Sequence, residues 1–182
     1  MACVSYHLNS FKSSSSIQAE AELTGDLCDG ALTLQLTGGL DSLVWPQASS
    51  SPTRRDGLWT STCLELFLYS AKEPSYLELN MSPCGDWQIY RFQGYRDGQE
   101  APEVSSPPLQ VFSPYKGRLV VTWKDNLWLS LLPSLGADCQ AAVTAVVEYY
   151  GDLAYLAQEH PDDKPDFHRM LGSKSFGAHQ PA

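Results

Sequence analysis

The chain has 182 residues, which is enough for one domain with an ordinary buried core, and 43% of the residues are hydrophobic, which excludes a wholly disordered chain. Only 18% are charged, which argues against an all-helical bundle or a coiled coil rich in ion pairs. The net charge of -9 argues against proteins that bind nucleic acid or an anionic membrane surface, because both need clustered cations.

The predicted elements are mostly strands. Residues 31–38 (ALTLQLTG), 63–69 (CLELFLY) and 76–82 (YLELNMS) alternate apolar and polar side chains, which is the pattern of a strand with one apolar face. In chain order, the sequence predicts strands over 4–8, 16–24, 31–38, 63–69, 76–82, 86–95, 117–124, 126–132 and 140–150.

Turns and loops separate these strands. Residues 83–86 (PCGD) predict a hairpin turn, whereas 49–57 and the proline-rich stretch 97–114 predict surface loops. Helix is confined to two stretches: 127–136, where a helical turn and a strand end are equally compatible with the pattern, and 153–159. The sequence therefore predicts a single all-β domain over 1–182, an antiparallel β-sandwich of immunoglobulin-like or jelly-roll type with little helix, and a flexible tail over 169–182.

The N-terminal residues have no basic segment followed by an apolar one, and no apolar run is long enough to cross a bilayer. The five cysteines are odd in number and widely spaced, with no CxxC motif, which favours reduced thiols over a disulfide framework or a metal cluster. We therefore expect a cytoplasmic protein without membrane association, although a mature form of a secreted precursor has the same features.

The polar faces of two predicted strands carry the most informative residues. Glu65 and Phe67 share one face of their strand, and Glu78 and Asn80 share one face of the next strand. Sequential strands are usually neighbours, so these side chains form one polar and aromatic patch with Trp59 at its rim. Carboxylate and amide groups with an aromatic ring suit a sugar, and the alternative is an ordinary solvated face.

Enzyme motifs such as GxSxG, HExxH and phosphate-binding glycine loops are absent, so we expect no catalytic activity. Glycoside hydrolysis is the alternative with a catalytic activity. It needs two carboxyl groups roughly 5–10 Å apart, one of them with a raised pKa. Glu65 and Glu78 on neighbouring strands are able to meet that distance, but such pairs are common on sheets.

Residues 156–168 (LAQEHPDDKPDFH) are rich in histidine and aspartate. This segment predicts a solvated loop, with a ligand-facing loop and a metal site as alternatives, because proline and aspartate are ordinary loop residues. We assign no metal ligands here and expect His168 to be a structural histidine. The residues concerned are His160, Asp162, Asp163, Asp166 and His168.

Three segments together resemble a known family. LWTSTCLELFL (58–68), YLELNMSPCGDWQIYRFQGYRDG (76–98) and VVEYYGDLAYLAQEHPDDKPDFH (146–168) are similar in order and spacing to the DOMON-like domains, in the uncharacterised bacterial group related to family 9 carbohydrate-binding modules. The similarity covers roughly residues 31–168. It implies a β-sandwich with a ligand cleft on one sheet, binding a sugar or related polyol without catalysis.

The resemblance also implies roles for particular residues. In family 9 modules two Trp rings sandwich a terminal sugar, and the spacing of Trp59 and Glu65 matches one such Trp and a strand Glu. Asn80 matches the Asn of an Arg-x-Asn pair, whereas Glu78 stands where that family has Arg. The weaker ligand-binding candidates are Arg91, Arg96, His160 and His168.

The second Trp has no counterpart in this chain, so Tyr155, Phe167 or His160 would have to supply the second ring. Calcium supports the fold in family 9 modules, but its ligands cannot be aligned here, and we expect no resident cofactor. Other DOMON domains bind haem through Met and His, which makes a haem or redox module the alternative function. Met81 is predicted on the apolar face, away from the cleft, and a protein partner remains a further possibility.

Overall fold

The computed structural model describes residues 2–11, 16–104, 109–125, 127–136, 138–160, 163–170 and 172–176. The strands are β1 (Ala2–Ser10), β2 (Gln18–Gly25), β3 (Asp29–Thr37), β4 (Cys63–Ser70), β5 (Tyr76–Met81), β6 (Trp87–Phe92), β7 (Leu109–Tyr115), β8 (Arg118–Lys124), β9 (Cys139–Tyr149), β10 (Asp152–Ala157) and β11 (Lys174–Ser175). The helical elements are η1 (Leu40–Ser42), η2 (Leu58–Thr60), α1 (Leu127–Leu131) and η3 (Phe167–Arg169). The fold is therefore all-β with very little helix, as the sequence predicts.

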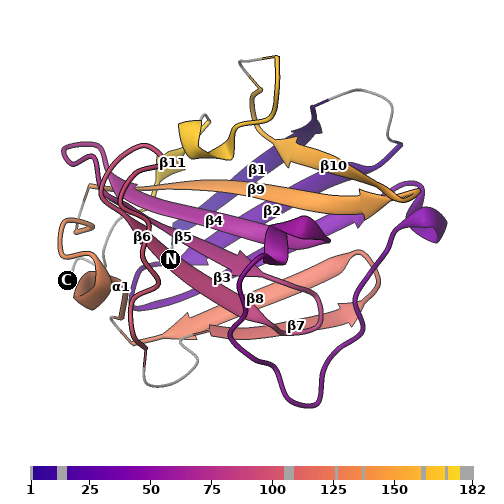
Figure 1. Cartoon of the computed structure of the whole chain (residues 1–182), viewed down its shortest axis with the longest axis horizontal. Coiled ribbons are helices and arrows are strands. Elements are labelled where there is room, and N and C mark those ends of the chain that lie inside the picture. Colours follow the sequence, from indigo (N-terminus) through magenta and orange to yellow (C-terminus); the bar gives the residue numbers. More distant parts are fainter. Residues whose placement is uncertain are drawn as a thin grey trace.

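The strands pair antiparallel in the order β6-β5-β4-β9-β10-β1-β2-β3-β8-β7, and β11 adds to the edge of β9 beside β10. The path runs through two layers, which meet where β1 pairs with β10 over only two residue pairs. We call β6, β5, β4, β9 and β10 the front sheet; Figure 1 looks onto its outer face, with β1, β2 and β3 behind it. The arrangement is a nearly closed barrel or sandwich.

The core between the two layers is made by the apolar faces that the alternation predicts. Leucines at every second position of β3, β4 and β5 point inward and are almost completely buried, and Met81 joins them. Trp123 and Trp128 also lie in this core, with their rings edge to face at 6.1 Å. Removing these apolar surfaces from water is the main source of the fold's stability.

The prediction of a loop over 97–114 is wrong for its last part, because Leu109–Tyr115 forms β7. Prolines exclude a central strand, but β7 is the last strand of the order and needs only one partner. The pairing with β8 is irregular between Phe112 and Tyr115, and Pro114 lies in that interval. An edge position and a bulge are the places where a strand tolerates proline.

Two other predictions differ from the structure. The strand predicted over 126–132 is instead the short helix α1, whose Trp128 and Leu131 pack into the core. The stretch 153–159, for which the sequence also allowed a helix, instead contributes most of β10 (Asp152–Ala157), which pairs with β9. Both are short apolar segments, for which periodicity alone does not separate a buried strand from a buried helical turn.

The flexible tail expected over 169–182 is ordered in its described part. Lys174 and Ser175 form β11 on β9, and Phe176 is fully buried against Trp123. Residues 177–182 lie outside the described residues. Within the described part of the chain, no helix is long and apolar enough to cross a membrane.

The outer face of the front sheet is buried as well as the inner one. Every residue of β5 is buried, and so is nearly every residue of β4. An antiparallel sheet usually leaves one face to water, so something must cover this one. The cover consists of the loops that carry η2 and η3, which lie in front of the sheet in Figure 1. The space beneath them is the candidate site.

Candidate ligand-binding site

Strand register brings the predicted carboxyl groups together. On the outer face, Glu65 of β4 lies opposite Asn80 of β5 and opposite Thr144 of β9. Phe67 lies opposite Glu78, so the two glutamates are diagonal neighbours on one face of the sheet. The sequence interpretation of a shared polar and aromatic patch is therefore correct in its placement of these side chains.

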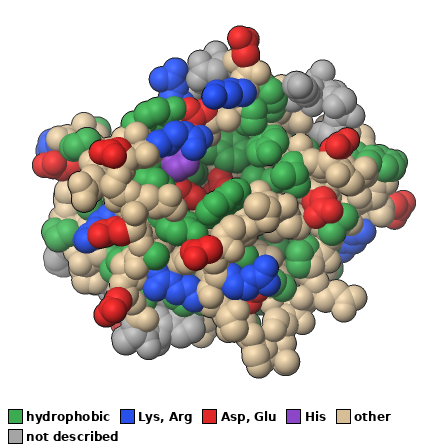
Figure 2. All heavy atoms as spheres, in the orientation of Figure 1, with side chains coloured by type: hydrophobic (Ala, Val, Ile, Leu, Met, Phe, Trp, Pro, Cys, Tyr) green, Lys and Arg blue, Asp and Glu red, His purple; other side chains and the backbone are tan. Residues whose placement is uncertain are grey.

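A cavity of about 320 Å³ lies above this patch. Its aromatic walls come from Trp59, Phe92, Tyr155 and Phe167. Its polar lining comes from Glu65, Glu78, Arg96, Gln99 and His168, and Val146 and Pro165 complete it. Figure 2 shows this face as hollowed, with hydrophobic side chains around acidic side chains and a histidine.

Glu65 forms the floor of the cavity and is only 4% exposed. Its Oε2 accepts a hydrogen bond of 2.9 Å from the Thr144 hydroxyl. Burial, and next the nearby charge of Glu78, raise the pKa of Glu65 to about 8. At neutral pH its carboxyl group is therefore mainly protonated and able to donate a hydrogen bond as well as accept one.

Glu78 lies beside it and is held by Asn80, its neighbour on the outer face of β5. The Asn80 amide donates a hydrogen bond of 2.7 Å to Glu78 Oε1, while Asn80 Oδ1 accepts a contact of 3.5 Å from the Cys63 thiol. Burial also raises the pKa of Glu78, although the Asn80 hydrogen bond opposes the shift. Asn80 is fully buried and does not line the cavity, so it positions Glu78.

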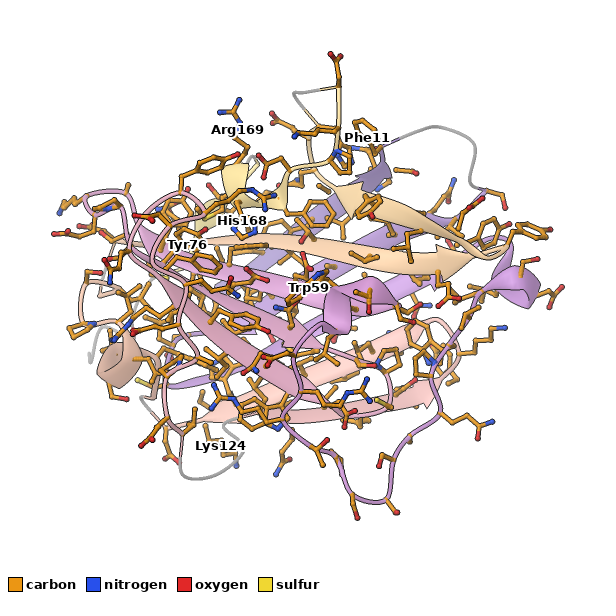
Figure 3. All side chains as sticks on the ribbon, in the orientation of Figure 1. Phe11, Trp59, Tyr76, Lys124, His168 and Arg169 are labelled. Atoms are coloured by element: carbon orange, nitrogen blue, oxygen red, sulfur yellow. The ribbon has the colours of Figure 1, made fainter. Side chains whose placement is uncertain are left out.

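His168 closes the other side of the carboxyl pair. Its Nε2 is 3.8 Å from Glu78 Oε2, and its Nδ1 shares a hydrogen bond of 2.6 Å with the Tyr76 hydroxyl. Burial, and next the positive charge of Arg96, lower the pKa of His168 to about 4, so the ring is neutral at physiological pH. Figure 3 shows Tyr76, His168 and Trp59 on the same side of the front sheet.

Arg96 ties the covering loop to the hairpin after β6. Its guanidinium donates to Asp166 Oδ1 at 2.8 Å, and the Tyr95 hydroxyl donates to the other oxygen of that carboxylate. Burial alone would raise the pKa of Asp166, but these hydrogen bonds lower it, so Asp166 is a stable anion. Arg96 is thus paired with Asp166, and its positive charge also opposes the effect of burial on the pKa values of Glu65 and Glu78.

Trp59 stands at the cavity rim and is 39% exposed. It lies in η2, which begins after Gly57 in the left-handed conformation that favours glycine. Its ring meets that of Tyr90 edge to face at 5.8 Å, and the Tyr90 hydroxyl donates to Asp56 at 2.8 Å. The loop therefore presents a fixed aromatic ring that water can still reach.

Two predicted binding residues lie elsewhere. Arg91 donates to the Leu131 carbonyl and pairs with Glu100 at the sheet edge. The ring of His160 packs on Phe11 at 5.3 Å, and its Nε2 lies 2.8 Å from the Asn9 carbonyl oxygen. Neither residue lines the cavity.

Several cavity residues went unpredicted. Phe92, Gln99, Val146 and Pro165 carried no individual signal, although alternation places Phe92 on the same face of β6 as Tyr90. Tyr155 and Phe167, which the sequence left open as a second ring, both line the cavity, with their centroids 6.0 Å apart. Tyr155 reaches the site because β10 is a strand, opposite Val146 of β9.

The described side chains around the cavity do not form a site for a metal ion or for haem. Over the residues that the structure describes, no group of three or more His, Cys, Asp and Glu side chains is arranged to hold a metal ion. Asp162 lies outside the described residues. Met81 is in the core, on the opposite face of β5 from Glu78, so a Met–His pair with His168 does not fit this cavity.

The chain matches no protein-family model, and no curated protein sequence matches it significantly. Among solved structures, a candidate carbohydrate-binding protein from Bacteroides uniformis is similar, with a TM-score of 0.67. The similarity covers 96% of this chain and 86% of that protein at 13% sequence identity. At this identity the likeness concerns the fold.

Proposed function

We propose that the cavity on the front sheet binds a carbohydrate or a related polyol, and that the protein binds it without chemical conversion. The observation that carries this proposal is a small cavity, open to solvent on one side, that combines aromatic walls with a buried carboxyl pair. Its volume of about 320 Å³ lies at the lower end of the range for small-molecule sites, which suits one sugar ring.

The lining matches both surfaces of a sugar. The face of Trp59 offers an apolar plane for ring C–H groups, with Tyr155 and Phe167 as further walls. Glu65 and Glu78 offer acceptors for hydroxyl groups, and a protonated Glu65 adds a donor. Because these groups are buried and preoriented, binding a hydroxyl group requires little reordering of side chains.

Two further facts support the proposal. The structurally similar protein from Bacteroides uniformis is described as a candidate carbohydrate-binding protein. The motifs over 58–68, 76–98 and 146–168 resemble the DOMON-like group related to family 9 carbohydrate-binding modules. Trp59 and Glu65, which match sugar-binding residues of family 9 modules, line the cavity, and so does Glu78, which stands where those modules have Arg.

Calorimetric titration with hexoses, pentoses, disaccharides and sugar alcohols tests the proposal. We expect at least one of them to bind to the wild-type protein. Trp59→Ala should weaken this ligand about tenfold or more, because the ring supplies a large part of the contact with the sugar. Tyr150→Ala is the matched control, since Tyr150 is 75% exposed and does not line the cavity.

Absence of heat with every sugar and polyol in the wild-type protein would overturn the proposal. Equal affinities in wild type and Trp59→Ala would also overturn it, because they would place the ligand elsewhere.

Glycoside hydrolysis is the second candidate, favoured by one observation. Two buried, neighbouring carboxyl groups with raised pKa values form the type of pair that supplies a general acid. Incubation with aryl glycosides decides between the two functions. Sugar release that disappears in both Glu65→Gln and Glu78→Gln would establish hydrolysis, and no release from glycosides that bind would exclude it for those substrates.

A further inference from the structure

Among the described residues, no lysine or arginine side chain forms an ion pair with the carboxyl groups at the cavity floor. Glu65 and Glu78 are 4% and 5% exposed, and each accepts a hydrogen bond from a neutral group, the Thr144 hydroxyl and the Asn80 amide. Buried carboxyl groups are normally paired with a cation, because loss of water makes an unpaired charge costly.

The nearby basic groups do not supply this cation. His168 faces Glu78 at 3.8 Å, but burial keeps its ring neutral, and its other nitrogen is bonded to Tyr76. Arg96 lines the cavity, yet its Nε and Nη2 both donate to Asp166. Arg96 therefore acts on the two glutamates only through space, and a cation in direct contact with the carboxyl pair would favour its ionised form.

The walls favour the same kind of ligand. The faces of aromatic rings attract cations as well as sugar C–H groups, and four aromatic residues surround this floor: Trp59, Phe92, Tyr155 and Phe167. The net charge of -9 also raises the local concentration of cationic ligands around the protein. Charge and wall chemistry therefore point to a ligand that is both polyhydroxylated and positively charged.

We infer that the occupant is an amino sugar, bound with its ring against the aromatic walls and its protonated amine at Glu65 and Glu78; this inference rests on the proposed sugar site. The amine fills the position that a Lys or Arg would take beside a buried carboxyl pair. Its N–H groups donate to the carboxyl oxygens that Thr144 and Asn80 leave unengaged. Hydroxyl groups of the same ligand face Gln99 and the remaining polar lining.

Paired titrations of charged and uncharged sugars test the inference. Glucosamine, galactosamine and mannosamine are each compared with the parent hexose and the N-acetyl derivative at pH 6.5, where an amine is protonated. We expect one amine to bind at least about tenfold more tightly than both of its neutral counterparts, since only the ammonium group forms a close charge pair with the ionised glutamates.

Substitution of the carboxyl groups gives the matched control. Glu65→Gln and Glu78→Gln keep the side-chain shape and should each remove most of the preference for the amine. Glu20→Gln removes the same charge from an exposed position on β2, in the other layer, and should leave the preference unchanged. Thermal unfolding of each variant verifies that it is folded.

A second readout is the number of protons exchanged on binding. An ammonium group stabilises the ionised pair, so the protein should release protons when it binds the amine and release fewer when it binds the hexose. Titration in two buffers with different ionisation enthalpies measures this number.

The outcomes separate this inference from the proposed function. If hexoses and their amines bind equally, and Trp59→Ala weakens both, the sugar site stands and the amine inference fails. A preference for the amino sugar that persists in both Glu65→Gln and Glu78→Gln also overturns the inference, since other residues would then bind the ammonium group. If no sugar of any kind binds, both fail.

Discussion

Strands β4 and β5 have two buried faces of opposite character. Inward, β4 and β5 present Leu64, Leu66, Leu68, Leu77, Leu79 and Met81, all within one apolar core. Outward, the same strands present Glu65 and Glu78 among aromatic rings, beneath covering loops. Residues on both faces are buried, and the outer face borders a cavity of about 320 Å³.

The difference indicates that the inner face stabilises the fold, whereas the outer face provides the polar groups for ligand binding. Leucines at the core gain free energy by leaving water, and they need no partners beyond close packing. Buried carboxyl groups lose free energy by leaving water, so their presence under loops opposes folding. We interpret the outer face as a site whose incomplete polar pairing is completed by a ligand.

The largest expected effect on stability comes from a substitution on the inner face of β4. Leu66→Ala should lower the free energy of unfolding by about 2–5 kcal/mol, because it removes buried contacts and leaves a cavity between the sheets. Glu65→Gln, one position away on the same strand, should not destabilise the protein at neutral pH. Urea unfolding of the two variants measures the contrast. A similar loss of stability in both would contradict the division between the faces.

The dependence of stability on pH is the next largest effect. Glu65 titrates near pH 8 when folded and near its ordinary value of about 4.3 when unfolded, so the folded state binds more protons between these values. Its stabilising contribution is complete below pH 4.3 and is lost as the pH rises toward 8. His168, with a folded pKa of about 4, acts in the opposite direction between pH 4 and its unfolded value of about 6.5.

Above pH 6.5 only the carboxyl contribution of these two groups remains, so stability should fall by about 1–2 kcal/mol between pH 6.5 and 8. Denaturant midpoints across this range measure the change. Glu65→Gln should flatten the profile over the same interval. A wild-type profile with no downward slope, or the same slope in the variant, would show that burial of this carboxyl group is not penalised.

A smaller effect, confined to binding, is expected at the rim. Trp59 is 39% exposed, so Trp59→Ala should change the free energy of unfolding by less than about 1 kcal/mol. Ligand affinity should nevertheless fall about tenfold, which corresponds to about 1.4 kcal/mol. Parallel denaturation and titration of this variant test the prediction, and a large loss of stability without loss of binding would assign Trp59 to the core.

The smallest effect is expected in the covering loop. Asp166→Asn removes the charge opposite Arg96, whose side chain is half-exposed and screened by water, while the Asn carbonyl oxygen can still accept a hydrogen bond from Arg96 or Tyr95, so the loss should be about 1 kcal/mol. Global stability should therefore barely change, whereas amide exchange over residues 163–170 should accelerate. Unchanged exchange there would show that this ion pair does not hold the loop over the cavity.

The sequence predicted the parts of the molecule that depend on local alternation. The period of two identified the inner face of β4 and β5 and placed Glu65, Glu78 and Asn80 together on the other face. It did not reveal that this outer face is buried, because the cover comes from segments distant in sequence. For the same reason Asn80, which was expected at the ligand, is covered on the outer face beside the cavity and positions Glu78.

Contacts between residues distant in sequence also explain why two residues predicted to bind the ligand do not line the cavity. Arg91 lies on the same face of β6 as Ile89, opposite to the face of Tyr90, and contacts Glu100 and the Leu131 carbonyl. Neither contact could be predicted from the sequence. His160 belongs to the same loop as His168, but it packs beside Phe11 at the other end of that loop. Composition identified the loop, whereas only tertiary structure separates its two histidines.

A titration followed by two-dimensional NMR tests the central claim most directly. Adding the sugar with the highest affinity to labelled protein should shift the Trp59 indole signal and the amides around Glu65, Tyr155 and His168. Signals from the outward side chains of β7, including Phe112 and Tyr115, should stay in place. Shifts confined to β7, or no shifts at saturating sugar, would contradict a sugar site on the outer face of the front sheet.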